Sequence, residues 1–287
     1  CLAELLAAAR TRPEVSWFAA LMVYHDDPGL VNSAAHILLP WGWVLDWGAR
    51  QPLAGDFLTP QPVFGACAGA ALYRKSMFDE LGGFDESLRF LYEDVDLNFR
   101  AQLAGHACWT VPSARVQHRV AQSLGASSPA YVQALFCNAA LCLLGDLPPA
   151  FCRRYRRQVL YYWVMSLADQ IRLRAAAPIV RGLWAAHWRA PRMLAKRAAQ
   201  TPNLLQRGEA IAEWAEWADR HVPDSGDSPA AVAARAEGRW RRRCRLLGPV
   251  LAALVLLTPL LCWCGVAALQ DRWLARRLRA AARQPSE

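Results

Sequence analysis

The sequence lacks the cysteine spacings of the common zinc modules, because none of its nine cysteines forms a C-x-x-C pair. The irregular spacing gives no disulfide framework either, so we expect reduced, buried thiols in a cytosolic compartment. The first residues contain no cationic stretch followed by a cleavage site, so no signal peptide is visible. The aromatic residues do not follow an RNA-binding pattern, and we expect no nucleic-acid partner.

Hydrophobic residues make up 54% of the chain and charged residues 20%, which excludes a disordered protein. With 287 residues, one catalytic domain with an appendage is expected. The net charge is +9, and most of the positive residues are arginines that follow Arg153. Such a basic surface suits a membrane, a nucleic acid or a phosphorylated substrate, and charge alone does not choose among them.

The chain starts at Cys1 inside a predicted helix that extends to Arg10, so we expect that further sequence precedes it. An apolar strand is predicted over 15–23, and the residues around Asp26 and Asp27 predict a turn after it. The segment 38–62 is rich in Trp, Gly and Pro and predicts a long ordered loop.

The region 64–118 has the most regular pattern. We predict in order a small-residue strand over 65–73, helices over 75–81 and 93–103, and strands over 107–111 and 114–118. This alternation indicates an α/β block, which we assign to residues 1–128.

The pattern changes after residue 128 to helices rich in Arg and Trp, such as 131–144 and 153–174. A linker is predicted over 221–228, and we treat 129–238 as a helical extension.

Residues 246–269 are almost purely apolar and are long enough to cross the hydrocarbon core of a bilayer. A membrane helix, a re-entrant hairpin and a buried core helix all remain open, since Pro249 and Pro259 interrupt the run. Arginines flank the segment on both sides, so the positive-inside rule gives no orientation. The basic tail 271–283 resembles an interfacial helix, and we assign 239–287 to this third region.

Three acidic residues, Glu93, Asp94 and Asp96, open the predicted second helix of the α/β block. Ordinary capping explains them, and Asp96 with Arg100 four residues later makes a surface pair. In the functional interpretation, the aromatic and apolar segment 88–92 partly desolvates these acids, and the three carboxylates repel one another. Both effects raise their pKa values. A carboxylate that is ionised yet basic is what deprotonation of a sugar hydroxyl requires.

His118 ends the last predicted strand of the block and can bind a divalent cation through a neutral ring nitrogen. The alternative is an ordinary hydrogen-bonded polar residue. His25, His36 and His106 are weaker candidates on the same argument.

An ordered series of motifs supports a resemblance to a known family. The motifs are Gly65-Ala66-Cys67, Arg74-Lys75, Met77-Phe78-Asp79-Glu80-Leu81-Gly82-Gly83-Phe84-Asp85-Glu86, Tyr92-Glu93-Asp94-Val95-Asp96-Leu97, Arg100, Gly105 and His118. Together they resemble inverting family-2 glycosyltransferases of the GT-A, Rossmann-like fold, in the rhamnosyl- and galactofuranosyltransferase-like branch. The resemblance covers 2–149 and is densest over 65–118.

The resemblance implies a nucleotide-diphosphate-sugar donor, a divalent metal such as Mn or Mg, and inversion at the anomeric carbon. Asp94 matches the general base, Glu93 its neighbour at the acceptor, and His118 the histidine that helps to hold the metal. The small-residue segment beside the donor sugar and the acceptor is matched by Gly65, Ala66 and Cys67.

The sequence also departs from the family. The nucleotide-binding half with its D-x-D motif is expected before residue 1, and the acidic pair at 26–27 is interpreted as a turn. Cys137-Asn138 stands where many relatives carry Arg-Asn, and no glycine follows His118 before Gly125.

These features favour a glycosyltransferase at the cytoplasmic face of the cell membrane that extends a polysaccharide or a lipid-linked glycan. The chain is then the C-terminal, acceptor-side half of a GT-A domain, followed by a helical, membrane-associated region. The alternative is a non-catalytic membrane-associated scaffold derived from a glycosyltransferase. A D-x-D strand upstream of Cys1 would favour the enzyme, and an initiator Met there would favour the scaffold.

Overall fold

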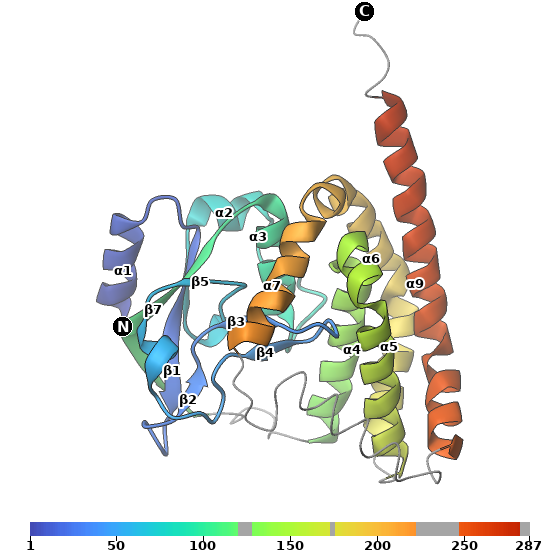
Figure 1. Cartoon of the computed structure of the whole chain (residues 1–287), viewed down its shortest axis with the longest axis horizontal. Helices are drawn as coiled ribbons and strands as arrows, with labels where there is room; N and C mark the ends of the chain where they lie inside the picture. Colours follow the sequence, from blue (N-terminus) through green and yellow to red (C-terminus); the bar gives the residue numbers. More distant parts are fainter. Residues whose placement is uncertain (120–127, 173–175, 222–246, 282–287) are drawn as a thin grey trace, which may run out of the picture. The chain divides into compact units, whose positions relative to one another are not determined.

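The computed structural model describes residues 1–119, 128–172, 176–221 and 247–281 (Figure 1). The chain divides into two compact units. Unit 1 contains the described residues of 1–128 and 213–232, and unit 2 contains those of 129–212 and 233–287. Most of the predicted linker at 221–228, the arginines at 239–245 and the segment that ends at Gly125 lie outside the described residues.

Unit 1 is built on a five-stranded mixed sheet with the order β2-β1-β7-β5, and β6 also pairs with β1. Its strands are β1 (Trp17–Tyr24), β2 (Val31–Ser33), β5 (Pro62–Val63), β6 (Ala71–Tyr73) and β7 (Cys108–His118). β1 and β7 are parallel, whereas the other pairs are antiparallel. Seven of the eight residues of β1 are buried, as expected for a central strand covered on both faces.

Helices cover both faces of this sheet. Figure 1 shows α1 (Leu2–Thr11) and α3 (Glu93–Ala104) on opposite sides of it. Leu5 of α1 packs in a cluster with Phe18 of β1 and Val111 of β7. A short helix, α2 (Lys75–Glu80), precedes α3. The sheet therefore holds the N-terminal end of α3 in a fixed place.

Three local predictions need correction. The segment predicted as a loop contains a hairpin of β3 (His36–Leu38) and β4 (Val44–Asp46), and the 3₁₀ helix η1 (Gly55–Leu58). The strand predicted over 65–73 is regular only in β6, because the 3₁₀ helix η2 (Ala68–Ala70) interrupts it. The two strands predicted over 107–118 are one strand, β7, with a register shift against β1 between Ala20 and Leu21.

Unit 2 is helical and contains α4 (Pro129–Gly145), α5 (Pro149–Arg172), α6 (Ala177–Gln206) and α9 (Leu247–Ala281). A further helix, α7 (Gly208–His221), begins in unit 2, and its residues from Glu213 onward belong to unit 1. The predicted fold class, an α/β part followed by a helical part, is thus confirmed.

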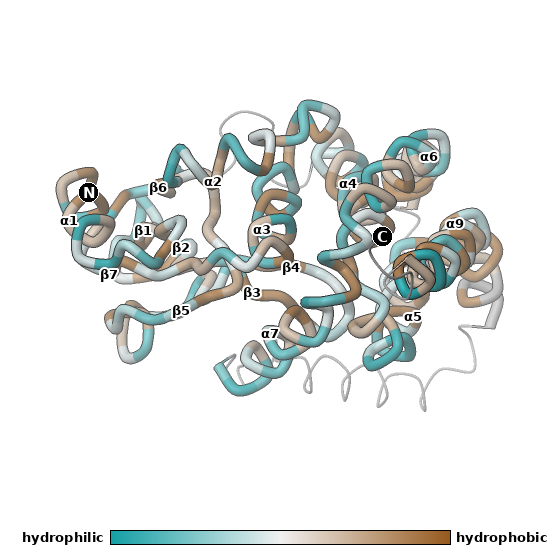
Figure 2. Tube along the Cα trace, turned by 90° about the horizontal axis from the view of Figure 1, so that it is seen from above, coloured by the Kyte–Doolittle hydropathy of each residue, from teal (hydrophilic) through white to brown (hydrophobic). Residues whose placement is uncertain are grey.

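The helix α9 continues through Pro259 into the basic tail, so it is one helix and not a re-entrant hairpin. Figure 2 colours much of it as apolar. Val255 is 70% and Leu269 65% exposed, which does not fit a buried core helix. By length and composition, the segment Ala252–Ala281 is able to cross a membrane.

Candidate functional site

The backbone is strained directly before α3. Leu91 and Tyr92 have φ values of 64° and 70°, in the left-handed region that residues other than glycine rarely adopt. Such conformations cost about 1–3 kcal/mol each and concentrate at functional sites. Tyr92 is buried and makes an edge-to-face contact with Trp43 at a centroid distance of 6.2 Å. The two left-handed residues lead directly into the first turn of α3, which carries Glu93 and Asp94.

Backbone groups orient both oxygens of the buried Asp94 carboxylate. The Ala68 N–H donates to Oδ2 at 3.0 Å, and the Val95 N–H donates to Oδ1 at 2.8 Å. In the described part of the chain, no lysine or arginine lies within 4.0 Å of this carboxylate. Asp94 is therefore fixed in direction without being neutralised by a cation, as a general base requires.

Asp96, two residues later on α3, has the opposite arrangement. It is fully buried and bonded by Arg100 through Nε and Nη2, both at 2.8 Å. Arg100 also donates to the carbonyls of Leu81 and Gly83 beyond α2. The pair of Asp96 and Arg100 was predicted at the surface, and this location is wrong. The pair is buried and connects α3 to the end of α2.

His36 of β3 lies beside the Asp94 carboxylate. Its Nε2 atom is 3.9 Å from Asp94 Oδ2 and 3.6 Å from Asp46 Oδ1. The Asp46 Oδ1 atom is buried and accepts no hydrogen bond from the described residues. The imidazole therefore stands between two carboxylates that come from different elements. Sequence reasoning ranked His36 low, because no local motif marks a histidine in a three-residue strand.

The hydrogen bonds of Asn98 determine which His36 nitrogen carries the proton. The Asn98 Oδ1 atom accepts from Trp17 Nε1 at 3.1 Å and from the Ala66 N–H at 3.3 Å. Since both of these groups are donors only, the orientation of the amide follows. Asn98 Nδ2 then donates to the Ala66 carbonyl and to His36 Nδ1, at 3.1 and 3.0 Å. The proton of His36 consequently lies on Nε2 and faces the carboxylates.

The predicted small-residue segment lies against this network. A Cβ on Gly65 would come within 2.2 Å of Asn98 Cγ, so glycine is needed there for close packing. Ala66 is buried and pairs with the Asn98 amide through its backbone. The Cys67 Sγ lies within 4.8 Å of side-chain atoms of His36 and Asp94. The structure thus brings Gly65, Ala66 and Cys67 together with Asp94.

Two side chains near Asp94 have shifted pKa values. Burial, and then the Asp94 charge, raises the pKa of Glu93. The Glu93 Oε2 atom is buried without a hydrogen-bond partner among the described residues. Burial, followed by the Asp46 and Asp94 carboxylates, raises the pKa of the Cys67 thiol far above its ordinary range. Cys67 therefore remains a neutral thiol beside the carboxylates.

His118 is not part of the His36, Cys67 and Asp94 group. It lies at the end of β7 opposite Tyr24 of β1, and its Nδ1 is 2.7 Å from Asn32 Oδ1. An amide oxygen only accepts, so Nδ1 carries the proton and Nε2 keeps its lone pair. This is the tautomer that a histidine needs in order to bind a metal through Nε2. Its role as a ligand stays a prediction.

The acidic pair at 26–27 forms a turn, as predicted. The Asp27 Oδ1 atom accepts from the Gly29 N–H at 3.1 Å, and its carbonyl accepts from the Leu30 N–H. Asp27 therefore has a local structural role.

In unit 2, Arg189 of α6 approaches the Cys137-Asn138 pair of α4. Its Nη1 atom is 3.2 Å from Cys137 Sγ and 3.3 Å from Asn138 Oδ1. A guanidinium thus lies beside Cys137, where the resemblance in the motifs predicts an arginine. Sequence reasoning missed this residue, because it comes from another helix about fifty positions away.

Comparison with known proteins agrees with the resemblance in the motifs. The chain matches no protein-family model. It is 32% identical over 114 residues to two proteins of Mycobacterium tuberculosis, from different strains, each named N-acetylglucosaminyl-diphospho-decaprenol L-rhamnosyltransferase. The match covers 37% of this chain and 35% of each relative, so the chain spans about a third of the length of the curated relatives it matches. At a coarse level, this similarity supports a glycosyltransferase.

Proposed function

We propose that this chain is the acceptor side of an inverting, membrane-associated glycosyltransferase. The enzyme transfers a sugar from a nucleotide-diphosphate-sugar to a polysaccharide or lipid-linked glycan. Asp94 carries the proposal, because it is a buried carboxylate that is held by backbone N–H groups and has no neutralising cation in the described residues. The rhamnosyltransferase relatives, whose name includes a lipid-linked acceptor, support the same class of reaction.

In the proposed reaction, Asp94 takes the proton from the acceptor hydroxyl, and the hydroxyl oxygen forms a bond to the anomeric carbon of the donor. The bond from that carbon to the diphosphate oxygen breaks, and its electron pair leaves with the nucleotide diphosphate. Attack from the opposite side inverts the anomeric centre. Because the leaving group is already an acidic diphosphate, the reaction needs no general acid.

Further residues position the base and the substrates. The Nε2–H of His36 faces the Asp94 and Asp46 carboxylates and limits how Asp94 turns. The unpartnered Glu93 Oε2 is available to an acceptor hydroxyl. Cys67 adds a neutral wall beside Asp94. His36 is thus a positioning residue, and Glu93 binds substrate.

A divalent metal, Mn or Mg, fits this proposal, and His118 would hold it through Nε2 while Asn32 keeps the proton on Nδ1. Such a metal neutralises the charge that develops on the diphosphate leaving group. Asn32→Ala should weaken Mn binding by His118 about 10–100-fold, as is typical when such a supporting hydrogen bond is lost. Isothermal calorimetry with MnCl₂ on the full-length gene product measures this loss. Equal affinity in the variant and the parent would remove His118 from the metal site.

The membrane association that we propose depends on α9, whose first part is apolar with exposed side chains and whose last turns carry arginines. Flotation of the chain with liposomes, with and without residues 239–287, tests it. We expect that deletion abolishes recovery in the floating fraction. Equal recovery of both forms would contradict a membrane role for this helix. We place the enzyme at the cytoplasmic face, where nucleotide-sugars are available.

The central experiment screens nucleotide-sugars with the full-length gene product, Mn or Mg, and lipid-linked acceptors. We expect one donor to be consumed, with a product whose anomeric configuration is opposite to that of the donor by NMR. A product with retained configuration would exclude the single displacement with Asp94 as base. The matched control is Asp94→Asn, which removes the proton acceptor but keeps the size of the side chain and one of its two backbone hydrogen bonds, since an amide nitrogen does not accept from N–H.

A further inference from the structure

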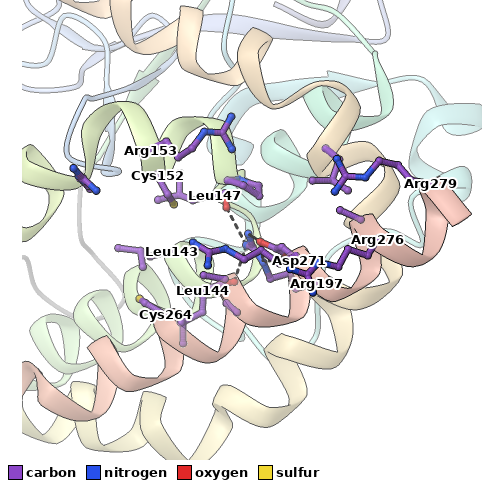
Figure 3. Close-up of a pocket in the computed structure, with 17 residues that line it drawn as sticks. Leu143, Leu144, Leu147, Cys152, Arg153, Arg197, Cys264, Asp271, Arg276 and Arg279 are labelled. Carbon is purple, nitrogen blue, oxygen red and sulfur yellow. Dashed lines mark hydrogen bonds and ion pairs between the residues drawn. The ribbon is translucent and has the colours of Figure 1, made fainter.

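A cavity of about 550 Å³ lies within unit 2, where the end of α4 and the start of α5 meet α6 and α9. Figure 3 shows side chains from these helices around it. Its volume lies within the range of small-molecule sites. The cavity belongs to unit 2 alone, and the proposed chemistry at Asp94 does not use it.

The floor of the cavity is a neutral ion pair. Arg197 of α6, only 3% exposed, bonds Asp271 of α9 through Nε at 3.0 Å and Nη2 at 2.7 Å. Its Nη1 donates to the carbonyls of Leu144 and Leu147 at 3.0 and 2.9 Å, as the dashed lines in Figure 3 show. All three guanidinium nitrogens of Arg197 thus donate hydrogen bonds, and the pair holds α6, α9 and the end of α4 together.

The wall of the cavity carries a large excess of positive charge. Five further arginines line it, and Asp271 is its single lining acid: the arginines are Arg153, Arg156, Arg272, Arg276 and Arg279. All five are exposed. Arg153 has a loose, exposed pair with Glu209 at 3.6 Å, whereas the other four have no acidic partner among the described residues. These exposed guanidinium groups are accessible to an external anion, and guanidinium binds phosphate well with paired hydrogen bonds.

Three arginines of α9, at positions 272, 276 and 279, lie on one face of that helix by their spacing. The lining positions 264, 268, 272 and 276 form one row at four-residue intervals, and 267, 271, 275 and 279 form the neighbouring row. The first row reads Cys, Ala, Arg, Arg and the second reads Ala, Asp, Ala, Arg, so the arginines stand at the same end of both rows. The cavity is therefore apolar at one end of this face and cationic at the other.

Apolar side chains line one end of the cavity, and the part of α9 that precedes the arginines exposes apolar side chains as well. Leu143, Leu144 and Leu147 line this end of the cavity, as Figure 3 shows. The part of α9 that precedes the arginines exposes Val255 and Leu269, which suits hydrocarbon better than water. Arginines directly after an apolar helical segment lie where lipid phosphates are found. A soluble nucleotide or a nucleic acid would use the charge but not the apolar end.

We propose that this cavity binds a lipid diphosphate, with the diphosphate at Arg156, Arg272 and Arg276 and the first part of the hydrocarbon chain against the leucines. The identification of this lipid as the carrier of the glycan acceptor rests on the proposed function, whereas the binding site itself does not. The neutral Arg197–Asp271 floor keeps the site assembled, and the unpaired arginines supply the affinity.

The test measures binding of geranylgeranyl diphosphate to the full chain in neutral detergent, without any nucleotide-sugar. R156Q/R272Q/R276Q should weaken binding about tenfold or more, because charge-assisted hydrogen bonds to the diphosphate are lost. Geranylgeraniol, which lacks the diphosphate, and inorganic pyrophosphate, which lacks the chain, should each bind more weakly by a similar factor.

The matched control is R154Q/R157Q/R277Q, which removes the same charge from exposed arginines of α5 and α9 that do not line the cavity. It should bind like the parent. Equal loss in both triple variants, with the same helical content by circular dichroism, would overturn the site in favour of general surface charge. Full competition by phosphatidylglycerol vesicles would overturn the diphosphate assignment in favour of a bulk headgroup. Because no sugar transfer is measured, failure here is distinct from failure of the proposed enzyme.

Discussion

Buried aspartates occur in both units, but their surroundings differ. In unit 2, Asp271 is held by two bonds from Arg197, which is itself buried and further bonded to main-chain carbonyls. In unit 1, the partners of Asp94 among the described residues are backbone N–H donors and a histidine nitrogen at 3.9 Å. A buried charge with a matched cation stabilises one arrangement of helices, whereas a buried charge without one is more typical of catalysis.

Asp96 makes the comparison sharper, because it lies two residues from Asp94 on the same helix and does have an arginine. Its pairing with Arg100 resembles that of Asp271 in unit 2. In the proposed function, the helix therefore carries one aspartate for structure and one for chemistry, and their neighbours distinguish the two.

The largest effect is expected from Asp94→Asn. Loss of the general base should lower the rate of sugar transfer by about 10²–10⁴-fold. Donor binding should remain close to the parent value, since the asparagine keeps the size of the side chain. The unfolding midpoint should fall only slightly, because the amide oxygen still accepts one of the two backbone hydrogen bonds. Transfer assays with the full-length gene product, together with thermal unfolding, measure both. Unchanged turnover would remove Asp94 from the role of base.

Asp96→Asn is the control for that variant. It breaks the buried pair with Arg100 and should lower stability by about 3–5 kcal/mol. If Asp94→Asn destabilised the protein as strongly as Asp96→Asn, the contrast between the two aspartates would be lost.

Arg197→Met tests the other side of the comparison. It leaves the Asp271 carboxylate buried and unpaired, so the free energy of unfolding should fall by about 3–5 kcal/mol. R197M/D271L should recover most of this loss, because an apolar pair of similar volume often replaces a buried ion pair without cost. Chemical unfolding in detergent, followed by circular dichroism, compares the two. If Arg197→Met were as stable as the parent, burial of the Asp271 carboxylate would not depend on Arg197.

A smaller effect is expected at His36, which orients Asp94. His36→Phe keeps a ring but removes the N–H donor, and should lower kcat about tenfold, which corresponds to about 1.4 kcal/mol of barrier. KM should change little, because His36 does not contact substrate in this proposal. His36→Gln restores a donor and should recover part of the rate. A rise in KM together with a fall in kcat, without rescue by glutamine, would indicate a merely structural histidine.

The smallest effect concerns Glu93 and pH. Burial and Asp94 raise the pKa of Glu93 above its ordinary value of 4.5, so the folded state keeps this proton to higher pH than the unfolded state does. Stability should therefore fall as pH rises from 4.5 through the raised pKa, and stay lower above it. Glu93→Gln should flatten this decline and stabilise the protein at neutral pH. Urea unfolding midpoints across that pH range measure the slope, and identical slopes in both proteins would contradict the shift.

The regular elements could be predicted from local patterns. The apolar run of β1, the glycine with φ 93° that ends α3 at Gly105, and the apolar run within α9 are all visible in sequence. The hairpin of β3 and β4 was missed, because its three-residue strands are too short to show periodicity. The candidate base Asp94 was predicted from its motif, but neither His36 nor Arg189 has a local signal.

By itself the sequence determined the α/β and helical parts, the acidic opening of α3 and the length of the apolar segment, because each depends on residues close together in the chain. The tertiary structure decided that Asp271 is paired with Arg197, which nitrogen of His36 carries a proton, and where five arginines line one cavity. These outcomes depend on contacts between residues that are far apart in the chain, such as Ala66 with Asn98, 32 positions away, and Arg197 with Asp271, 74 positions away. Desolvation and hydrogen-bond geometry arise only when such distant groups are brought together.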